Sequence, residues 1–320
     1  MRIGLLGEPE DAEILSVQKH VNALGVDTVV VNLRDFPKTT RVSYEVEKGL
    51  RFQVNGEDLS DVGAWYVRRY GFTDPILSAK DVTEEKWGEI YGKFREWQAV
   101  EGEKNVHVSA LLRFLAESAP VINPPEAFIG HNRKPHQVYL IRKAGLPIPD
   151  FILSNDLNDL RAFLQRHGRC VYKPLAGLRH VREVTLDLLE SRQASLQSEP
   201  IMLQALAEGR HIRAYVVGDT VVGAGEIQFD REKSIDYRVT QRGVELLDLP
   251  DQVKRDCIAA ARACSMPFTG LDVIWDDATG THKFLECNPS PMFANFERYT
   301  GAPVASSLAR LLVEAAKGQG

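Results

Sequence analysis

Three oxygen-bearing side chains near the end of the 320-residue chain have the types and spacing of a cation site. Asp272 lies in the apolar segment 268–275, and Glu286 and Asn288 lie in the segment 282–288. If the intervening residues turn, the two segments pair as a hairpin and Asp272 lies beside Glu286. Two carboxylates and an amide oxygen suit Mg²⁺ that is bridged to nucleotide phosphates and completed by water.

Alternation along the second strand supports this interpretation. Glu286 and Asn288 project from one face, whereas Leu285 and Cys287 are expected to point into packing. A solvated sheet face with accidental acids is the structural alternative. We favour the metal site because these acids interrupt very apolar strands, where an unpaired buried charge is costly.

Two lysines precede this hairpin in positions where an anionic partner is expected. Lys134 opens a predicted helix, and Lys173 lies near the end of the apolar strand 170–174. A lysine among apolar residues needs an anion, and a phosphate group provides one. A salt bridge would satisfy Lys173 equally well, so the lysines alone do not decide between the two.

The segment 201–208 and two arginines complete the set. An apolar strand that ends in this segment can offer backbone N–H and C=O groups to an adenine edge, and Glu208 can contact ribose hydroxyls. Arg213 and Arg238 follow, and phosphoryl transfer needs cations where charge spreads over the equatorial oxygens. A surface salt bridge is the alternative for each arginine.

The chain that must position these residues opens as a strand–helix–strand unit. Residues 2–7 form a predicted buried strand, a helix ends at Gly25, and a second strand covers 26–33. This order predicts a parallel, Rossmann-like sheet. The first turn lacks a GxGxxG phosphate motif and carries Glu8 and Glu10, so we do not expect the nucleotide there.

A mixed region follows this opening unit. It is predicted to contain a hairpin of strands 42–46 and 50–54 around Gly49, a strand over 64–70, and helices over 83–100 and 107–117. Arg68 and Arg69 lie at the end of the third strand. Either they grip an acidic substrate or they are structural, and the sequence leaves both alternatives open.

Pro124 and Pro125 mark a domain boundary, after which the pattern becomes α+β. Predicted helices cover 133–144, 154–167, 251–264 and 303–316, and predicted strands cover 151–153, 170–174, 183–186, 200–206, 213–217, 221–228, 268–275 and 282–288.

Composition narrows the function classes. The net charge of −5 gives no electrostatic reason to expect a nucleic-acid partner, and no apolar run approaches the ~20 residues of a membrane helix. The four cysteines form no CxxC pair, and none lies at zinc-ligand spacing. The N-terminus is too acidic for a secretory signal, so we expect a reducing cytoplasm. The sequence leaves a homo-oligomer open.

Taken in order, these residues resemble the ATP-grasp superfamily. The run from Lys134 to Pro149 is similar to the RimK-type branch of this superfamily. Arg213–Asp219 resembles that branch's DxRxxVxGD strand, with His211 in place of its acidic residue. Leu285–Pro291 resembles the branch's LEVNxSPG segment. The resemblance covers residues 121–316. It implies a chain of α/β and α+β parts: an N-terminal Rossmann-like pre-ATP-grasp domain over 1–120 and two α+β ATP-grasp subdomains over 121–200 and 201–320.

The resemblance also implies cofactors and roles. ATP and Mg²⁺ would be the cofactors, with Mn²⁺ as an alternative ion. Cofactor contacts would fall to Lys134, Lys173, Gln204, Ala205, Leu206 and Glu208, metal contacts to Asp272, Glu286 and Asn288, and catalytic contacts to Arg238, which would steady an acyl phosphate, and Arg213.

The implied activity is ATP-dependent ligation of a carboxylate to an amine or hydroxyl through an acyl phosphate, with release of ADP and phosphate. Trp65–Arg69, Asp236–Arg238 and Glu297–Gly301 look like segments of graspetide (microviridin-type) macrocyclases, which favours a precursor peptide as the carboxylate substrate. A ligase of free amino acids or small natural-product acids, and a non-catalytic nucleotide-binding regulator, are the alternatives.

Two departures from the family pattern bear on function. The loop after Lys173 has one glycine, and we hypothesise that Arg179, His180 and Arg182 hold phosphates by charge where backbone amides usually would. The segment 290–293 is apolar where the family often has glycine, so acceptor details are not carried over.

Overall fold

Residues 1–34, 36–46, 50–69, 87–175, 180–196 and 198–318 are described by the computed structural model. Gly49, Tyr70, residues 83–86 and Arg179, to which the sequence assigned places or roles, lie outside these ranges. The chain forms two compact units: one comprises Met1–Pro125 with Leu308–Gly320, and the other comprises Glu126–Ser307. The expected division into three domains stays a prediction.

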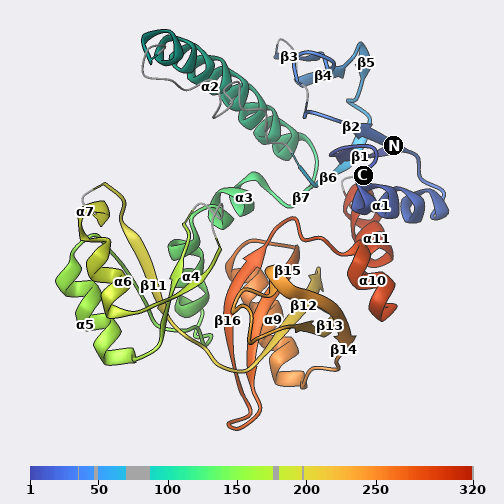
Figure 1. The fold of residues 1–320 in the computed structure, drawn as a ribbon. Coiled ribbons are helices and arrows are strands. Elements are labelled where there is room, and N and C mark those ends of the chain that lie inside the picture. The colour runs from blue at the N-terminus through green and yellow to red at the C-terminus, as the bar shows by residue number, and fades with distance from the viewer. Residues whose placement is uncertain (35, 47–49, 70–86, 176–179, 197, 319–320) are drawn as a thin grey trace. The chain divides into compact units, whose positions relative to one another are not determined.

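The first unit is built on a parallel sheet. Strand β1 (Arg2–Leu6) lies between β2 (Thr28–Val31) and β6 (Val62–Val67), and β7 (Val121–Ile122) pairs with β6 (Figure 1). After Arg2, β1 is a continuous apolar run, as parallel strands usually are, and Ile3, Leu5 and Leu6 are fully buried. The predicted parallel, Rossmann-like opening is confirmed.

Helix α1 (Ala12–Ala23) covers part of this sheet. It begins after Asp11, whose carboxylate accepts hydrogen bonds from two N–H groups of the first turn. Its residues Ile14, Val17 and Val21 recur at helical spacing and are fully buried. The expected helix is therefore present, and its apolar stripe forms part of the core of the first unit.

The rest of the first unit contains a small sheet and a long helix. Strands β3 (Val42–Val46), β4 (Leu50–Val54) and β5 (Glu57–Asp58) pair antiparallel. Helix α2 (Trp87–Ser118) is continuous, so the prediction of two separate helices is wrong. Residues 101–106 contain a glycine but no proline, and an isolated glycine costs a helix only about 1 kcal/mol.

The second unit contains two antiparallel sheets. The first has the order β10 (Arg182–Val184), β9 (Cys170–Lys173), β11 (Ile201–Ala205) and β8 (Phe151–Ser154). Helix α5 (Leu157–His167) packs Leu160, Phe163 and Leu164 against this sheet, and the short helices α6 (Leu186–Ser191) and α7 (Gln193–Leu196) follow β10. This small layer agrees with the expected α+β pattern.

The second sheet of this unit carries the residues with the strongest sequence signal. Its order is β14 (Gln241–Leu246), β13 (Thr220–Phe229), β12 (Arg210–Val217), β15 (Phe268–Asp276) and β16 (Thr281–Asn288). Helix α9 (Asp251–Ala263) covers one face (Figure 1). The predicted hairpin of β15 and β16 is confirmed, whereas the exposed edge strand β14 was not predicted.

Alternation along β12 and β15 separates the core from a polar face. Ile212 and Ala214 on β12, and Leu271 and Val273 on β15, lie in the core beneath α9. The residues between them in sequence therefore point to the opposite face. Asp272 is one of these residues, which explains how a carboxylate is placed inside an apolar strand.

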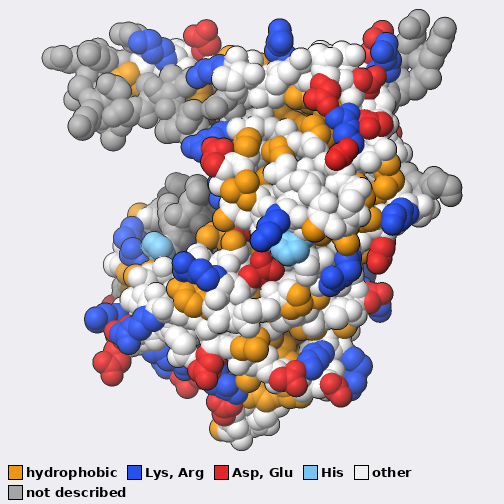
Figure 2. All heavy atoms as spheres, turned by 90° about the vertical axis from the view of Figure 1, so that its right-hand side faces the viewer, with side chains coloured by type: hydrophobic (Ala, Val, Ile, Leu, Met, Phe, Trp, Pro, Cys, Tyr) orange, Lys and Arg blue, Asp and Glu red, His pale blue; other side chains and the backbone are white. Residues whose placement is uncertain are grey.

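Short helices complete the described chain. They are α3 (Pro125–His131), α4 (Lys134–Lys143), α8 (Tyr237–Thr240) and α10 (Ala294–Thr300), and the chain closes with α11 (Val304–Lys317). On the face drawn in Figure 2, side chains of both charges are interspersed with apolar ones, and neither sign forms a continuous patch. Among the helices within the described ranges, none combines the length and apolar character needed to cross a membrane.

Candidate active site

A cavity of about 390 Å³ opens within the second unit. Its walls come from both sheets of that unit and from the start of α4. Nine of the residues that the sequence singled out line it: Lys134, Lys173, Gln204, Ala205, Leu206, Glu208, Arg238, Asp272 and Glu286. Residues from elements as far apart in the chain as α4 and β16 thus line the same cavity.

Two carboxylates lie side by side on its floor. Asp272 and Glu286 are direct partners in the register of β15 and β16. Arg213 on β12 is the register partner of Asp272 on its other side, and its Nη1 lies 2.6 Å from Asp272 Oδ1. The Tyr237 hydroxyl donates to Asp272 Oδ2 at 3.3 Å. The predicted adjacency of the two carboxylates is confirmed.

A β-bulge changes the direction of one side chain beside them. The register passes from Asp272 opposite Glu286 to Val273 opposite Phe284, which leaves Leu285 without a partner. Leu285 lines the cavity, so the expectation that it points into packing is wrong, whereas Cys287 is fully buried in the core as expected. Bulges often re-aim side chains beside active sites, and simple alternation cannot foresee them.

Helix α4 holds the strand that carries Glu286. The Lys134 ammonium forms an ion pair with the Glu286 carboxylate. The buried Gln137 amide donates to Cys287 O at 2.8 Å and accepts from Cys287 N at 3.0 Å, and His131 Nδ1 donates to the same carbonyl at 3.0 Å. Burial alone would raise the pKa of Glu286, but the positive charges of Lys134 and Lys173 outweigh it, so the pKa is lowered and the carboxylate is charged.

Lys173 lines the cavity from the end of β9. Within the described ranges its ammonium has no ion-pair or hydrogen-bond partner, although it lies at the end of β9 among apolar residues. Burial lowers its pKa, and the nearby negative charge of Glu286 opposes the shift. A salt bridge was the structural alternative for this lysine, and the described part of the chain supplies none.

The strand β11 supplies one wall with an unsatisfied donor. The Gln204 side chain is 1% exposed, and its Nε2 has no hydrogen-bond partner in the parts of the chain that the structure describes. The N–H groups of Ala205 and Leu206 donate to the carbonyls of Asp150 and Arg169, so they are engaged within the protein. An adenine edge would therefore meet the Gln204 amide and the carbonyl side of this segment.

The mouth of the cavity beside this wall is charged. Glu208 pairs with Arg169, which also pairs with Glu183 at 2.7 Å. The Glu208 side chain is 71% exposed, so its carboxylate is accessible to a ligand hydroxyl. The sequence did not point to Arg169 because nothing local indicates that it lies beside a residue 39 positions away.

Three aromatic rings form another wall. His211 lies edge-to-face with Phe229 at 4.9 Å and with Tyr237 at 5.9 Å between ring centroids. Burial, together with the positive charges of Arg231 and Lys173, lowers the pKa of His211 to about 4, so this ring is neutral at neutral pH. Phe229 and Arg231 were not expected at the site.

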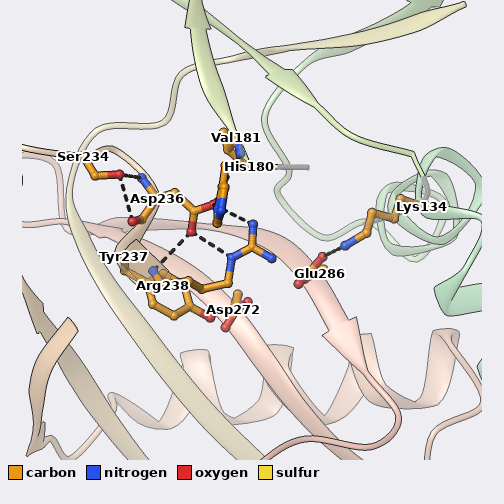
Figure 3. A network of polar contacts seen from close by, with 9 residues as sticks. All are labelled: Lys134, His180, Val181, Ser234, Asp236, Tyr237, Arg238, Asp272 and Glu286. Atoms are coloured by element: carbon orange, nitrogen blue, oxygen red, sulfur yellow. Dashed lines mark hydrogen bonds and ion pairs between the residues drawn. The ribbon is translucent and has the colours of Figure 1, made fainter. Parts of the chain in front are cut away.

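The Asp236 carboxylate joins two loops at the edge of the cavity (Figure 3). Its side chain is 4% exposed and accepts from Arg238 Nη2 at 2.6 Å and Nε at 2.8 Å, from Val181 N at 3.3 Å, and from His180 Nδ1 at 3.3 Å. Burial would raise its pKa, but the Arg238 contacts prevail and lower the pKa to about 2. The carboxylate therefore fixes both Arg238 and the chain at residues 180–181.

The sequence over residues 132–312 matches the model of the RimK-like ATP-grasp domain, which is more than half of the chain. The chain belongs to the RimK-like ATP-grasp family. It is thus a ligase of the ATP-dependent kind, and the resemblance inferred from its motifs is confirmed.

Solved structures and curated proteins agree with this family. The ATP-grasp ligase PsnB, solved with a minimal precursor, is 30% identical and has a TM-score of 0.84, with 98% of this chain and 99% of that chain covered. The macrocyclase MdnC of Microcystis aeruginosa, solved with its precursor peptide MdnA, shares the fold at 20% identity and a TM-score of 0.79, over 98% of this chain and all of that one. Tetrahydromethanopterin:alpha-L-glutamate ligase of Methanococcus maripaludis is 20% identical over 96% of both chains.

The donor set of this ATP-grasp chain fits a nucleotide-bridged ion. In the described ranges, no group of three or more histidine, cysteine, aspartate or glutamate side chains comes together. Two carboxylates lie here beside an ammonium and an amide that have no partner among the described residues, and this set fits a hard cation that keeps water and phosphate oxygens as its other ligands. The residues present therefore fit Mg²⁺ with a nucleoside triphosphate.

Two expected residues lie just outside the cavity. Arg213 reaches the site through Asp272. Asn288 lies two residues beyond Glu286 on β16, and its amide oxygen accepts a hydrogen bond from Ser290 N at 2.9 Å. The metal role of Asn288 and the catalytic role of Arg213 stay predictions. Arg182 is exposed on β10, and its phosphate role also stays a prediction.

Arg68 and Arg69 lie in the first unit. Arg68 is 4% exposed and pairs with Asp11 and Glu13, each at 3.3 Å. Arg69 is 57% exposed and lies 3.6 Å from Glu8. The burial of Arg68 matches the structural alternative for that residue, whereas Arg69 is accessible, and a substrate contact by either stays a prediction.

Proposed function

We propose that this ATP-grasp ligase activates a side-chain carboxylate of a peptide as an acyl phosphate and joins it to a hydroxyl or amine of the same peptide. The observation that carries the proposal is the adjacent pair Asp272 and Glu286, which faces a cavity together with Lys173, whose ammonium has no partner among the described residues. A peptide is favoured because PsnB and MdnC are ligases that were solved with precursor peptides.

Each wall of the cavity has a part in nucleotide binding. Gln204 donates to the base, Glu208 contacts the ribose, and Lys134 and Lys173 hold phosphate oxygens. Asp272, Glu286 and Asn288 would hold Mg²⁺, and PsnB has been solved with Mg and ADP. The ion, when bound, would neutralise charge on the phosphates; Mn²⁺ is the alternative ion.

The first half of the reaction joins the substrate carboxylate to the γ-phosphoryl group. A substrate oxygen forms the new O–P bond while ADP leaves with the electron pair of the broken one. Arg238 neutralises charge on the acyl phosphate, and the Asp236 contacts hold its guanidinium in place. In the second half the acceptor attacks the acyl carbon and phosphate leaves.

The test uses the full chain with ATP, Mg²⁺ and a synthetic acidic peptide that contains glutamate, threonine and lysine residues, with the minimal precursor of PsnB as a second probe. We expect ADP release that depends on the peptide, and a product that is lighter by one water. Peptide-independent ADP release, or ATP binding without any ADP release, would overturn the proposal. The latter result would instead indicate a nucleotide-binding regulator.

A ligase of free amino acids is the second candidate function. It is favoured by the similarity to tetrahydromethanopterin:alpha-L-glutamate ligase over nearly the whole chain. The same assay with L-glutamate and a mixture of free amino acids distinguishes the two, because only the peptide ligase requires the peptide. The four cysteines are free and buried, and a reducing cytoplasm remains our expectation for either function.

A further inference from the structure

A histidine and a buried aspartate form a dyad at the edge of the cavity. His180 Nδ1 lies 3.3 Å from Asp236 Oδ2 (Figure 3). The His180 side chain is 63% exposed, whereas the Asp236 side chain is 4% exposed. Asp236 and the neighbouring Val181 both line the cavity, so the His180 imidazole is anchored to a residue of the cavity wall while most of its own surface is exposed.

The chemistry of Asp236 fixes the tautomer of this imidazole. With a pKa of about 2 the carboxylate is ionised at neutral pH and can only accept hydrogen bonds. In the neutral imidazole, Nδ1 must then carry the proton, and Nε2 holds the free lone pair. Arg238 and the Val181 N–H hold the carboxylate from other directions, so the ring orientation is set by a fixed partner.

Five other polar side chains around the cavity are poorly suited to accept a proton. The Tyr237 hydroxyl donates to Asp272 Oδ2 at 3.3 Å, so its proton is already engaged. His211, with a pKa of about 4, is a weak base. Asp236 is occupied by its hydrogen bonds, and Asp272 and Glu286 are engaged with cations. His180, in contrast, is an exposed imidazole whose Nε2 lone pair can accept a proton.

We propose that His180 is the general base of the second half-reaction, a role that rests on the function proposed above. The acceptor hydroxyl or amine forms a bond to the acyl carbon, and its proton passes to His180 Nε2. The bond between the acyl carbon and the phosphate oxygen breaks, and phosphate leaves with the electron pair. His180 then returns the proton to solvent through its exposed edge. The phosphate-holding role that the sequence suggested for this histidine stays a prediction.

The test separates the two half-reactions with hydroxylamine. Hydroxylamine is uncharged at neutral pH and attacks an acyl phosphate without a base, so it reports formation of the acyl phosphate. For His180→Gln we expect peptide ligation to slow about 100-fold, while hydroxamate formation on the same acidic peptide and its ADP release stay within about twofold of the unmodified chain. For His180→Ala, added imidazole should restore ligation about tenfold, because a general base can be supplied from solution.

His167→Gln is the matched control, because His167 packs against Phe163 on α5 outside the cavity. It should match the unmodified chain in both measurements. Equal losses of ligation and hydroxamate in His180→Gln, unchanged ligation, or a lack of response to imidazole would each overturn the base assignment alone. If the unmodified chain forms neither hydroxamate nor ADP, the proposed function fails and the base assignment fails with it.

Discussion

Arg213 Nη1 lies 2.6 Å from Asp272 Oδ1, across the register of the neighbouring strands β12 and β15. Both side chains are about one-tenth exposed, and the Arg213 guanidinium also lies 5.5 Å from the centre of the Tyr215 ring. The pair therefore holds a charged carboxylate in a fixed place on an otherwise apolar strand. Its neighbour Glu286 is held in the same manner by Lys134. Both carboxylates are thus fixed in position before any ligand arrives.

Breaking the Arg213–Asp272 pair should be costly, and removing both charges should be cheaper. Arg213→Met leaves a buried carboxylate without its cation, and we expect the free energy of unfolding to fall by about 3–5 kcal/mol. Combining it with Asp272→Leu should recover most of that loss while abolishing ATP turnover. Denaturant unfolding of both variants measures this. Equal stability of the single and double variants would show that the pair is not coupled.

The Gln137 amide should stabilise both the fold and the site. Gln137→Leu keeps the shape of the side chain but removes both hydrogen bonds to the backbone of Cys287, which should cost about 1–3 kcal/mol of unfolding free energy. Because Cys287 follows Glu286, ATP affinity should also fall. Tyr139→Gln, at an exposed position of the same helix, is the control and should change neither. A loss of stability without any loss of ATP affinity would show that Gln137 does not contribute to ATP binding.

The Gln204 side chain should contribute to ATP binding and not to the free energy of unfolding. Its Nε2 is buried without a partner in the described residues, so Gln204→Leu should leave the free energy of unfolding unchanged or raise it. If the amide donates to the base of ATP, the dissociation constant for ATP should rise about tenfold, which corresponds to about 1.4 kcal/mol. Thermal unfolding and nucleotide titration measure the two effects. Lower stability with unchanged ATP affinity would contradict this role.

Acid should weaken the second unit through Asp236. Its pKa is lowered to about 2 in the folded protein, whereas an ordinary aspartate in an unfolded chain titrates near pH 4. Its stabilising contribution is therefore fully present above about pH 4 and is lost as the pH falls towards about 2. Asp236→Asn should lower the free energy of unfolding at neutral pH and should flatten its dependence on pH between about 4 and 2. An unchanged slope of stability against pH between 4 and 2 would contradict the assignment.

The strands and the helix that carry the candidate site could be predicted from local sequence patterns. The pairing of Asp272 with Glu286 could be predicted because two apolar strands with a turn between them pair as a hairpin. Lys134 at the start of α4 and Lys173 at the end of β9 also lie where the local pattern placed them. These features depend on contacts within short stretches of the chain.

Features that a local apolar pattern does not encode were missed. Leu285 faces the cavity because of a bulge, and the role of Gln137 requires β16 to lie beside α4, 150 positions later in the chain. Asp236 lies in a short loop whose sequence does not indicate that residues 180–181 contact it. The edge strand β14 is mostly exposed, so it lacks the apolar alternation that marks a strand.

The most direct test of the site is the affinity for ATP with and without Mg²⁺, measured by titration calorimetry. We expect Mg²⁺ to strengthen ATP binding by the unmodified chain about tenfold or more, and expect this gain to vanish in Asp272→Asn and Glu286→Gln. Glu245→Gln, an exposed position on β14, should retain the gain. If Mg²⁺ does not change ATP affinity, or if the gain survives in both site variants, the paired carboxylates do not hold the metal and the proposed site is wrong.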